Sequence, residues 1–254
     1  MAAVLDIEKD ESRDAFAGAV AARIERLPVT SWQVRARIII GTATFFDAFD
    51  ALAIAYILPV IVPLWKLTPQ EVGFLISAGA AGQLVGALVF GWIAERFGRI
   101  NALIGAIGTY AILSLACAFS WDYTSLLILR TVQGFGLGGE VPIAATYINE
   151  LSKAKGRGRF VLLFELVFPT GILAASVLGL WIVPTLGWQY MFVVGALPAV
   201  LILFLQRLLP ESPRWLATRG RYADAEVALR VVEKGTERAY GRPLPPPQMS
   251  VAAV

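Results

Sequence analysis

Four carboxylates interrupt long apolar stretches of this sequence: Asp47, Asp50, Glu140 and Glu165. A charged group in hydrocarbon costs several kcal/mol, so such residues normally face a bundle interior or a water-filled cavity, where they handle ions, protons or polar solutes. The chain contains no histidine. Any proton relay would therefore use carboxylates, with arginine as the fixed partner charge. This pattern indicates a transporter.

Asp47 and Asp50 lie three residues apart, so they share one face of a helix, with Thr44 one step below. Two nearby carboxylates in a low dielectric cannot both ionise easily, and we expect one of them to hold a proton. A site that titrates in this way is what a proton-coupled carrier needs. The alternative is a buried structural pair satisfied by hydroxyls and backbone groups.

A second helical face carries polar residues at three- and four-residue steps: Arg130, Gln133, Leu137, Glu140, Ala144 and Tyr147. Arg130 and Glu140 would lie about 15 Å apart in depth, at ~1.5 Å per residue, lining one cavity rather than forming one salt bridge. We expect the solute contacts to come from Gln133, Glu140 and Tyr147. The nearby glycines are interpreted as packing residues, since small side chains let membrane helices approach: Gly82, Gly86, Gly134, Gly136, Gly138 and Gly139.

Glu165 shares a helical face with Phe168 and Ile172. Two roles stay open for this carboxylate. It could contact the solute, or it could anchor helix packing by bonding Arg157 or Arg159.

The composition excludes several other classes of protein. Hydrophobic residues make up 57% of the 254 residues and charged residues 16%, whereas soluble domains carry about 25% charged residues. The net charge is only +3 and the basic residues are scattered, so no nucleic acid partner is expected. No metal-ligand cluster, nucleophile–base pair or phosphate-binding loop is evident in the sequence. We therefore expect no metal, no cofactor and no enzymatic activity.

Six apolar segments are each near the ~20 residues that a helix needs to span a bilayer, at roughly 38–63, 72–94, 101–119, 124–148, 160–183 and 188–209. Helices satisfy their backbone groups within lipid, so the predicted fold class is an all-α membrane protein, a six-helix transmembrane bundle. We expect three parts: a cytoplasmic segment 1–36 with an amphipathic helix, the bundle 37–210, and 211–254 as the start of a cytoplasmic loop with a soluble helix and a Pro-rich linker.

The orientation follows from lysine and arginine, which favour the cytoplasmic side. Basic residues precede the first span, follow the last and occupy alternate connections: Arg35, Arg37, Arg96, Arg99, Lys153, Lys155, Arg157, Arg159, Arg207, Arg214, Arg219 and Arg221. Both termini are therefore predicted to be cytoplasmic, in a multi-pass protein of the plasma (inner) membrane. The helix predicted at 12–27 could lie on the membrane surface or cap the cytoplasmic end.

The connection between the second and third spans reads GWIAERFGR, residues 91–99. Gly91 and Gly98 would permit close helix approach and a tight turn. Glu95, Arg96 and Arg99 could form a charge cluster that holds one conformation until the helices tilt. The alternative is an ordinary basic loop; the spacing of glycine, acid and arginine favours a gate.

These motifs resemble the major facilitator superfamily over nearly the whole chain. GWIAERFGR is similar to its signature loop, with Glu95 where aspartate is usual, and PESPRWL at 210–216 resembles the segment that closes the first half of sugar porters. YINE at 147–150 and GRGR at 156–159 resemble the end of the fourth helix and its connection. The resemblance adds further residues to the predicted cytoplasmic gate: Glu150, Arg157, Arg159, Glu211 and Arg214.

GFGLGGEVP, FFDAFD, Glu165 and the GW pair at 187–188 resemble a narrower branch. That branch is synaptic-vesicle-glycoprotein-like and includes niacin permeases and aromatic-acid/proton symporters. Ala48 stands where this branch often has glycine. In related sugar porters an aspartate of the first helix couples to an arginine of the fourth, which by motif position implies Asp50 and Arg130.

The resemblance implies a twelve-helix carrier made of two six-helix halves, of which this chain supplies the amino-terminal one. The expected function is proton-coupled secondary transport of a small polar solute by alternating access, with an organic or aromatic acid favoured over a sugar. The expected partners are the lipid bilayer, protons, the solute, and a carboxy-terminal half or a second copy. The alternative is a non-transporting half-domain that acts as a sensor or scaffold.

Overall fold

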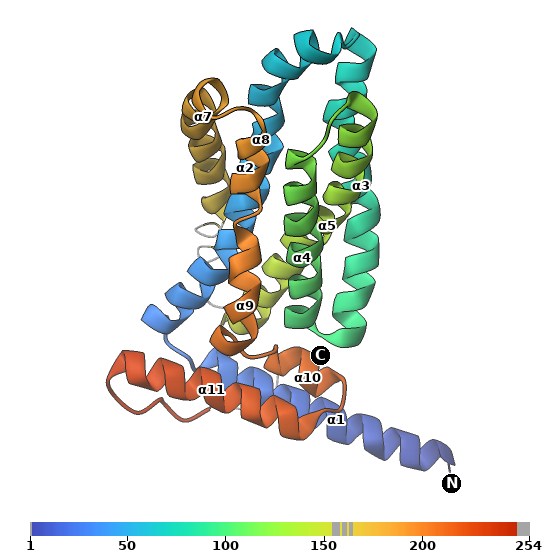
Figure 1. The fold of residues 1–254 in the computed structure, drawn as a ribbon. Coiled ribbons are helices and arrows are strands. Elements are labelled where there is room, and N and C mark those ends of the chain that lie inside the picture. The colour runs from blue at the N-terminus through green and yellow to red at the C-terminus, as the bar shows by residue number, and fades with distance from the viewer. Residues whose placement is uncertain (1, 154–157, 159–161, 163–164, 248–254) are drawn as a thin grey trace.

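The computed structural model describes residues 2–153, 158, 162 and 165–247, and every element in them is a helix. The helices form two groups (Figure 1). Long helices stand side by side as a bundle, and three helices lie across one end of it as a basal layer. The predicted fold class, an all-α membrane bundle, is confirmed.

The bundle contains α2 (Ser31–Trp65), α3 (Pro69–Phe97), α4 (Arg99–Ala118), α5 (Tyr123–Leu151), α7 (Val167–Thr185), α8 (Gln189–Gly195) and α9 (Pro198–Leu208). Of these, α2, α3, α4 and α7 are long and apolar enough to cross a membrane. The 29-residue α5 is long enough, but Arg130, Gln133 and Glu140 interrupt its apolar sequence, and all three are buried inside the bundle.

Two of the predicted spans differ from the helices observed. α2 starts at Ser31 rather than at residue 38, because a capping box between Thr30 and Gln33 starts the helix before the apolar residues begin. The predicted span 188–209 is divided between α8 and α9. Pro198 is the first residue of α9, and a proline lacks the N–H that would continue the preceding helix. The first residues of the span predicted at 160–183 lie outside the described ones.

Glycines bring α3 and α5 into backbone contact. A Cβ added to Gly82 or Gly86 would collide with the backbone of Thr131 or Phe135, and one added to Gly134 would collide with the backbone of Gly79. The packing role predicted for these glycines is confirmed. Such close contact fixes α5, and with it the polar face that α5 carries.

The basal layer consists of α1 (Ala2–Glu25), α10 (Pro213–Thr218) and α11 (Tyr222–Tyr240). Val20 and Ile24 of α1 are buried against an apolar cluster that includes Trp215 of α10 and Leu229 of α11. The apolar face predicted for residues 12–27 is therefore covered by protein. Of the two alternatives left open for this helix, a cap across the end of the bundle is the one observed.

An ion-pair cluster holds α1 to α11. Arg23 contacts Glu226 and Glu233 at 2.6 Å each, and Arg26 contacts Glu233 at 2.6 Å. Hydrogen bonding from Arg23 holds the pKa of Glu226 below its usual value. Burial raises the pKa of Glu233, but hydrogen bonds from Arg23 and Arg26 outweigh burial and leave that pKa lowered.

These two glutamates make the attachment of α1 sensitive to acid. A carboxylate whose pKa is lower in the folded state contributes stability that is present above the unfolded pKa and lost as the pH falls through the folded one. We expect residues 13–25 to lose protection from hydrogen exchange below about pH 4, under the ordinary glutamate pKa of ~4.3, before α4 does. Glu233→Gln should loosen α1 at neutral pH, whereas Glu237→Gln, an exposed change one turn away, should not. Unchanged protection of α1 at pH 3 would refute this role.

Candidate functional site

A buried ion pair joins α2 to α5 in the middle of the bundle. Arg130 Nη1 lies 2.6 Å from Asp50 Oδ2, and the two residues are 5% and 1% exposed. Gln133 completes the group, since its Oε1 accepts from Arg130 at 2.9 Å and its Nε2 donates to Asp50 Oδ1 at 2.9 Å. Both oxygens of Asp50 are thus hydrogen-bonded. The contact between Asp50 and Arg130 expected from the resemblance is present.

Three residues around this pair were not singled out from the sequence. The ring of Phe192 in α8 lies 5.7 Å from the Arg130 guanidinium carbon. Tyr110 of α4 donates to the Gly195 carbonyl at 2.6 Å, and Ser114 donates to the Phe192 carbonyl at 2.9 Å. Tyr110 and Ser114 lie four residues apart in an apolar segment, a spacing that could have identified them. These two hydrogen bonds hold the end of α8, just before α9 begins, against α4 and beside the ion pair.

Asp47 and Glu140 belong to a second buried polar group. Thr44 donates to Glu140 Oε1 at 2.9 Å, while Asp47 Oδ1 and Glu140 Oε2 are buried without a hydrogen-bond partner among the described residues. Asp47 and Glu140 are 6% and 3% exposed. A buried carboxylate oxygen left without a donor is costly. Each of these acids therefore keeps one buried oxygen that can still accept a hydrogen bond.

Neither Tyr147 nor Glu165 is hydrogen-bonded to these two groups in the described part of the chain. Tyr147 is fully buried, and its hydroxyl donates to the Pro210 carbonyl at 2.7 Å, which ties α5 to the segment after α9. This hydrogen bond is structural, and it uses the hydrogen that the Tyr147 hydroxyl could otherwise donate to a solute. Glu165 is exposed just before α7. The residues proposed to pair with it, Arg157 and Arg159, lie outside the described residues.

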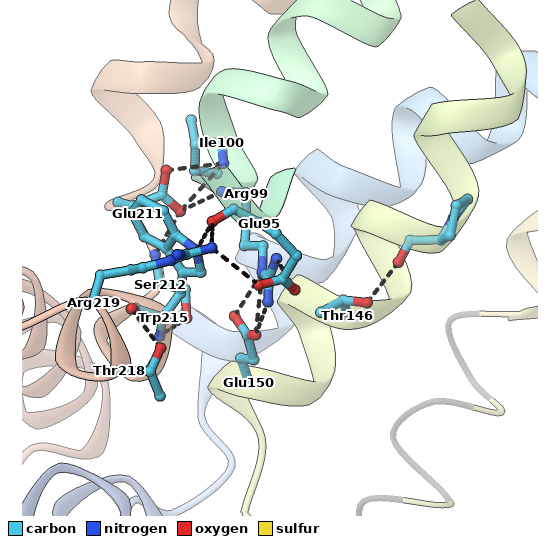
Figure 2. A network of polar contacts seen from close by, with 11 residues as sticks. Glu95, Arg99, Ile100, Thr146, Glu150, Glu211, Ser212, Trp215, Thr218 and Arg219 are labelled. Carbon is cyan, nitrogen blue, oxygen red and sulfur yellow. Dashed lines mark hydrogen bonds and ion pairs between the residues drawn. The ribbon is translucent and has the colours of Figure 1, made fainter. Parts of the chain in front are cut away.

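A charge cluster at the base of the bundle joins three helices (Figure 2). Arg99, at the start of α4, lies 2.7 Å from Glu95 of α3 and 2.9 Å from Glu150 of α5. Arg219, just after α10, donates to the carbonyl of Glu95, as does the Trp215 indole, at 2.9 Å. The cluster therefore connects the bundle to the basal layer.

Glu211 caps the start of α4. Its carboxylate accepts from the backbone N–H groups of Arg99 at 2.9 Å and Ile100 at 3.1 Å, as Figure 2 shows. Gly98 makes the preceding turn at φ 106°, a left-handed conformation that favours glycine. Burial raises the pKa of Glu211, partly offset by its backbone N–H donors. The tight turn predicted at Gly98 is confirmed.

Other residues of the predicted gate are placed differently. A Cβ at Gly91 would meet nothing within 4 Å, so the close approach predicted there is wrong for this structure. Arg96 is exposed and lies over the Trp92 ring at 5.4 Å, outside the charge cluster, because its position on α3 points it away from α4. Arg214 is half-buried on α10. Arg157 and Arg159 lie outside the described residues.

This helical membrane bundle contains a buried acid–arginine pair, and a charge cluster links one of its ends to a basal layer. That is the architecture of a transporter domain. The family model described as "Sugar (and other) transporter" matches residues 38–240. The chain therefore belongs to the sugar (and other) transporter family, within the major facilitator superfamily, whose members are transporters rather than enzymes.

The chain is similar to curated transporters and to solved transporter structures. The chain is 36% identical to the niacin transporter NiaP of Acinetobacter baylyi, over 84% of this chain and 48% of that protein. It is 32% identical to the 4-hydroxybenzoate transporter PcaK of the same organism, over 79% and 44%. The proton:xylose symporter XylE matches with a TM-score of 0.70 at 24% identity, over 83% of this chain and 52% of that one, which shows the fold. The chain spans about half the length of the curated relatives it matches.

Proposed function

We propose that this chain forms the amino-terminal half of a proton-coupled carrier for a small organic acid, and that aromatic acids are the favoured solutes. The observation that carries the proposal is the buried Asp50–Arg130 pair, 2.6 Å apart in the core of a transporter-family bundle. The names of the relatives support the solute class, because niacin, gallate and 4-hydroxybenzoate are all aromatic acids. The family description keeps a sugar as the second candidate.

Asp50 would carry the coupling proton. While Asp50 is ionised, its charge-assisted bonds to Arg130 and Gln133 hold α2 and α5 together. Protonation would remove that charge and leave Arg130 as a buried cation in need of an anion, which a carboxylate solute supplies. Binding of the acid and of the proton would then favour the same state, so the two would be transported together.

Asp47 and Glu140 would serve the solute or a second proton. Their unpartnered oxygens suit the hydroxyl or ring N–H of a polar solute, or a proton bound by either acid. The basal cluster of Glu95, Arg99 and Glu150 would act as the gate, since a shift of α4 relative to α3 and α5 would separate Arg99 from both glutamates. The basal layer would lie in the cytoplasm, with the bundle in the plasma membrane and a second half or a second copy opposite it.

Uptake in proteoliposomes tests the solute class. We expect nicotinate or 4-hydroxybenzoate to accumulate when the outside is acidic, and to exceed a sugar and a dicarboxylate supplied at equal concentration. The chain should be assayed alone and co-expressed with a carboxy-terminal half of a related carrier. Preferential uptake of the sugar would reassign the solute. Absence of uptake of every solute in both preparations would favour a sensor or scaffold.

A further inference from the structure

A basic groove lies between the first turns of α2 and the carboxy-terminal half of α11. Its volume is about 760 Å³, and its lining includes Arg35, Lys234 and Arg238 together with Trp32 and Val231. Its lining contains no acidic residue among those the structure describes. The groove is therefore cationic on two sides, with apolar surface between the charges.

These three cations differ from the arginines that make the ion pairs described above. Arg23, Arg26 and Arg99 are committed to glutamates at 2.6–2.9 Å. Arg35, Lys234 and Arg238 are exposed, and none makes an ion pair with an acid in the described part of the chain. Nearby Glu233 is already bonded to Arg23 and Arg26. The groove thus offers three uncompensated positive charges to an anion.

The depth of the groove matches the boundary of the membrane. α2 is one of the helices apolar enough to span a bilayer, and Ile38 on its outer face is 63% exposed. Arg35 precedes Ile38 by three residues, about 4.5 Å along the helix axis at ~1.5 Å per residue. Trp32 is half-buried one turn earlier, in the position typical of an aromatic anchor at the lipid headgroups. A bilayer placed on the apolar part of α2 would therefore bring the groove and its three cations to the level of the headgroup phosphates.

We propose that this groove binds the headgroup of an anionic phospholipid from the adjoining leaflet. The phosphate would be held by Arg35, Lys234 and Arg238, and the acyl chains would leave the groove beside Ile38, the exposed apolar residue one turn further along α2. The exposed Ile38 beside the groove favours a lipid over a soluble phosphate, because a soluble phosphate has no apolar part to pack against it. A lipid held between α2 and α11 would fasten the basal layer to the bundle. The inference rests on the membrane placement and not on the solute.

Native mass spectrometry of the detergent-purified chain tests the proposal. With phosphatidylglycerol added, we expect bound-lipid peaks at concentrations roughly tenfold below those needed with phosphatidylcholine. Each cation near a membrane surface contributes about a fivefold gain in affinity. The triple variant Arg35→Gln/Lys234→Gln/Arg238→Gln should therefore bind phosphatidylglycerol roughly a hundredfold more weakly.

The matched control removes three exposed arginines elsewhere: Arg221→Gln, Arg230→Gln and Arg242→Gln. This control should bind as the wild type does. Equal binding of the two lipids by the wild-type chain, or equal loss of binding in both triple variants, would overturn the proposal. Competition by glycerol 3-phosphate at the lipid's concentration would overturn it too, by showing a soluble phosphate site. Because binding is read without transport, failure here leaves the proposed function untouched, and failure of uptake leaves this result untouched.

Discussion

Replacement of Asp50 by asparagine is expected to reduce acid-driven accumulation of the solute roughly a hundredfold or more. The change removes the carboxylate that would take up the coupling proton, and it leaves Arg130, only 5% exposed, without its charged partner. Asparagine keeps a side-chain oxygen for Arg130, and Gln133 Oε1 still accepts from it at 2.9 Å. The fold should therefore survive while the titratable group is lost. Uptake of labelled nicotinate at outside pH 5.5 and 7.5 measures the effect.

Asp224→Asn is the matched control for this change. Asp224 also pairs with an arginine, Arg221, at 2.8 Å, but both side chains are more than half exposed. Exposed pairs contribute about 0–1 kcal/mol, so uptake should be unchanged. Size-exclusion profiles of the two variants check that each is folded. Full acid-stimulated accumulation by a folded Asp50→Asn variant would refute the role given to this carboxylate.

Replacement of Gly82 by alanine is expected to destabilise the bundle by about 3 kcal/mol or more, a size typical of severe overpacking in a core. A Cβ at Gly82 would collide with the Thr131 backbone, which cannot rotate away as a side chain can. α3 and α5 would have to separate along their whole contact. The thermal midpoint of the purified chain in detergent, and the fraction that elutes as a monodisperse peak, should both fall sharply.

Gly73→Ala supplies the comparison on the same helix. A Cβ at Gly73 meets nothing within 4 Å, so the methyl group has room. Alanine is also favoured over glycine inside helices by roughly 0.5–1 kcal/mol. The midpoint of this variant should stay level or rise slightly. Similar losses in the two variants would show that glycine itself, rather than close packing against α5, is what the helix requires.

The fold was predictable from the sequence where one physical rule dominated. Apolar segments of bilayer length predicted the bundle, and the glycines of α3 and α5 predicted that these helices pack closely against a neighbour. The length of an apolar segment was a poorer guide to where each helix begins and ends, because local backbone chemistry determines those positions. Pro198 divides the span predicted at 188–209, and the capping box at Thr30 extends α2 beyond its apolar residues. The length of an apolar segment indicates how much of the chain crosses the membrane core. Capping residues and prolines determine where each helix begins and ends.

The site was predicted in part, because spacing along one helix shows which residues share a face but not what faces them. The Asp50–Arg130 contact followed from motif resemblance, and its geometry agrees. Tyr147 shares the face of Arg130 and Gln133, yet it meets the Pro210 carbonyl because α5 passes from the bundle centre to the basal end. Tyr110 and Phe192 were missed, since their contacts depend on how α4 and α8 pack against α5.

Proton movement driven by the solute tests the central claim most directly. Proteoliposomes loaded with a pH-sensitive dye, without any imposed gradient, would receive nicotinate or 4-hydroxybenzoate on the outside. The account predicts acidification of the interior with the wild-type protein, assayed with its second half present, and none with Asp50→Asn. Solute entry measured in parallel without any change in internal pH would contradict proton coupling through Asp50 and Arg130.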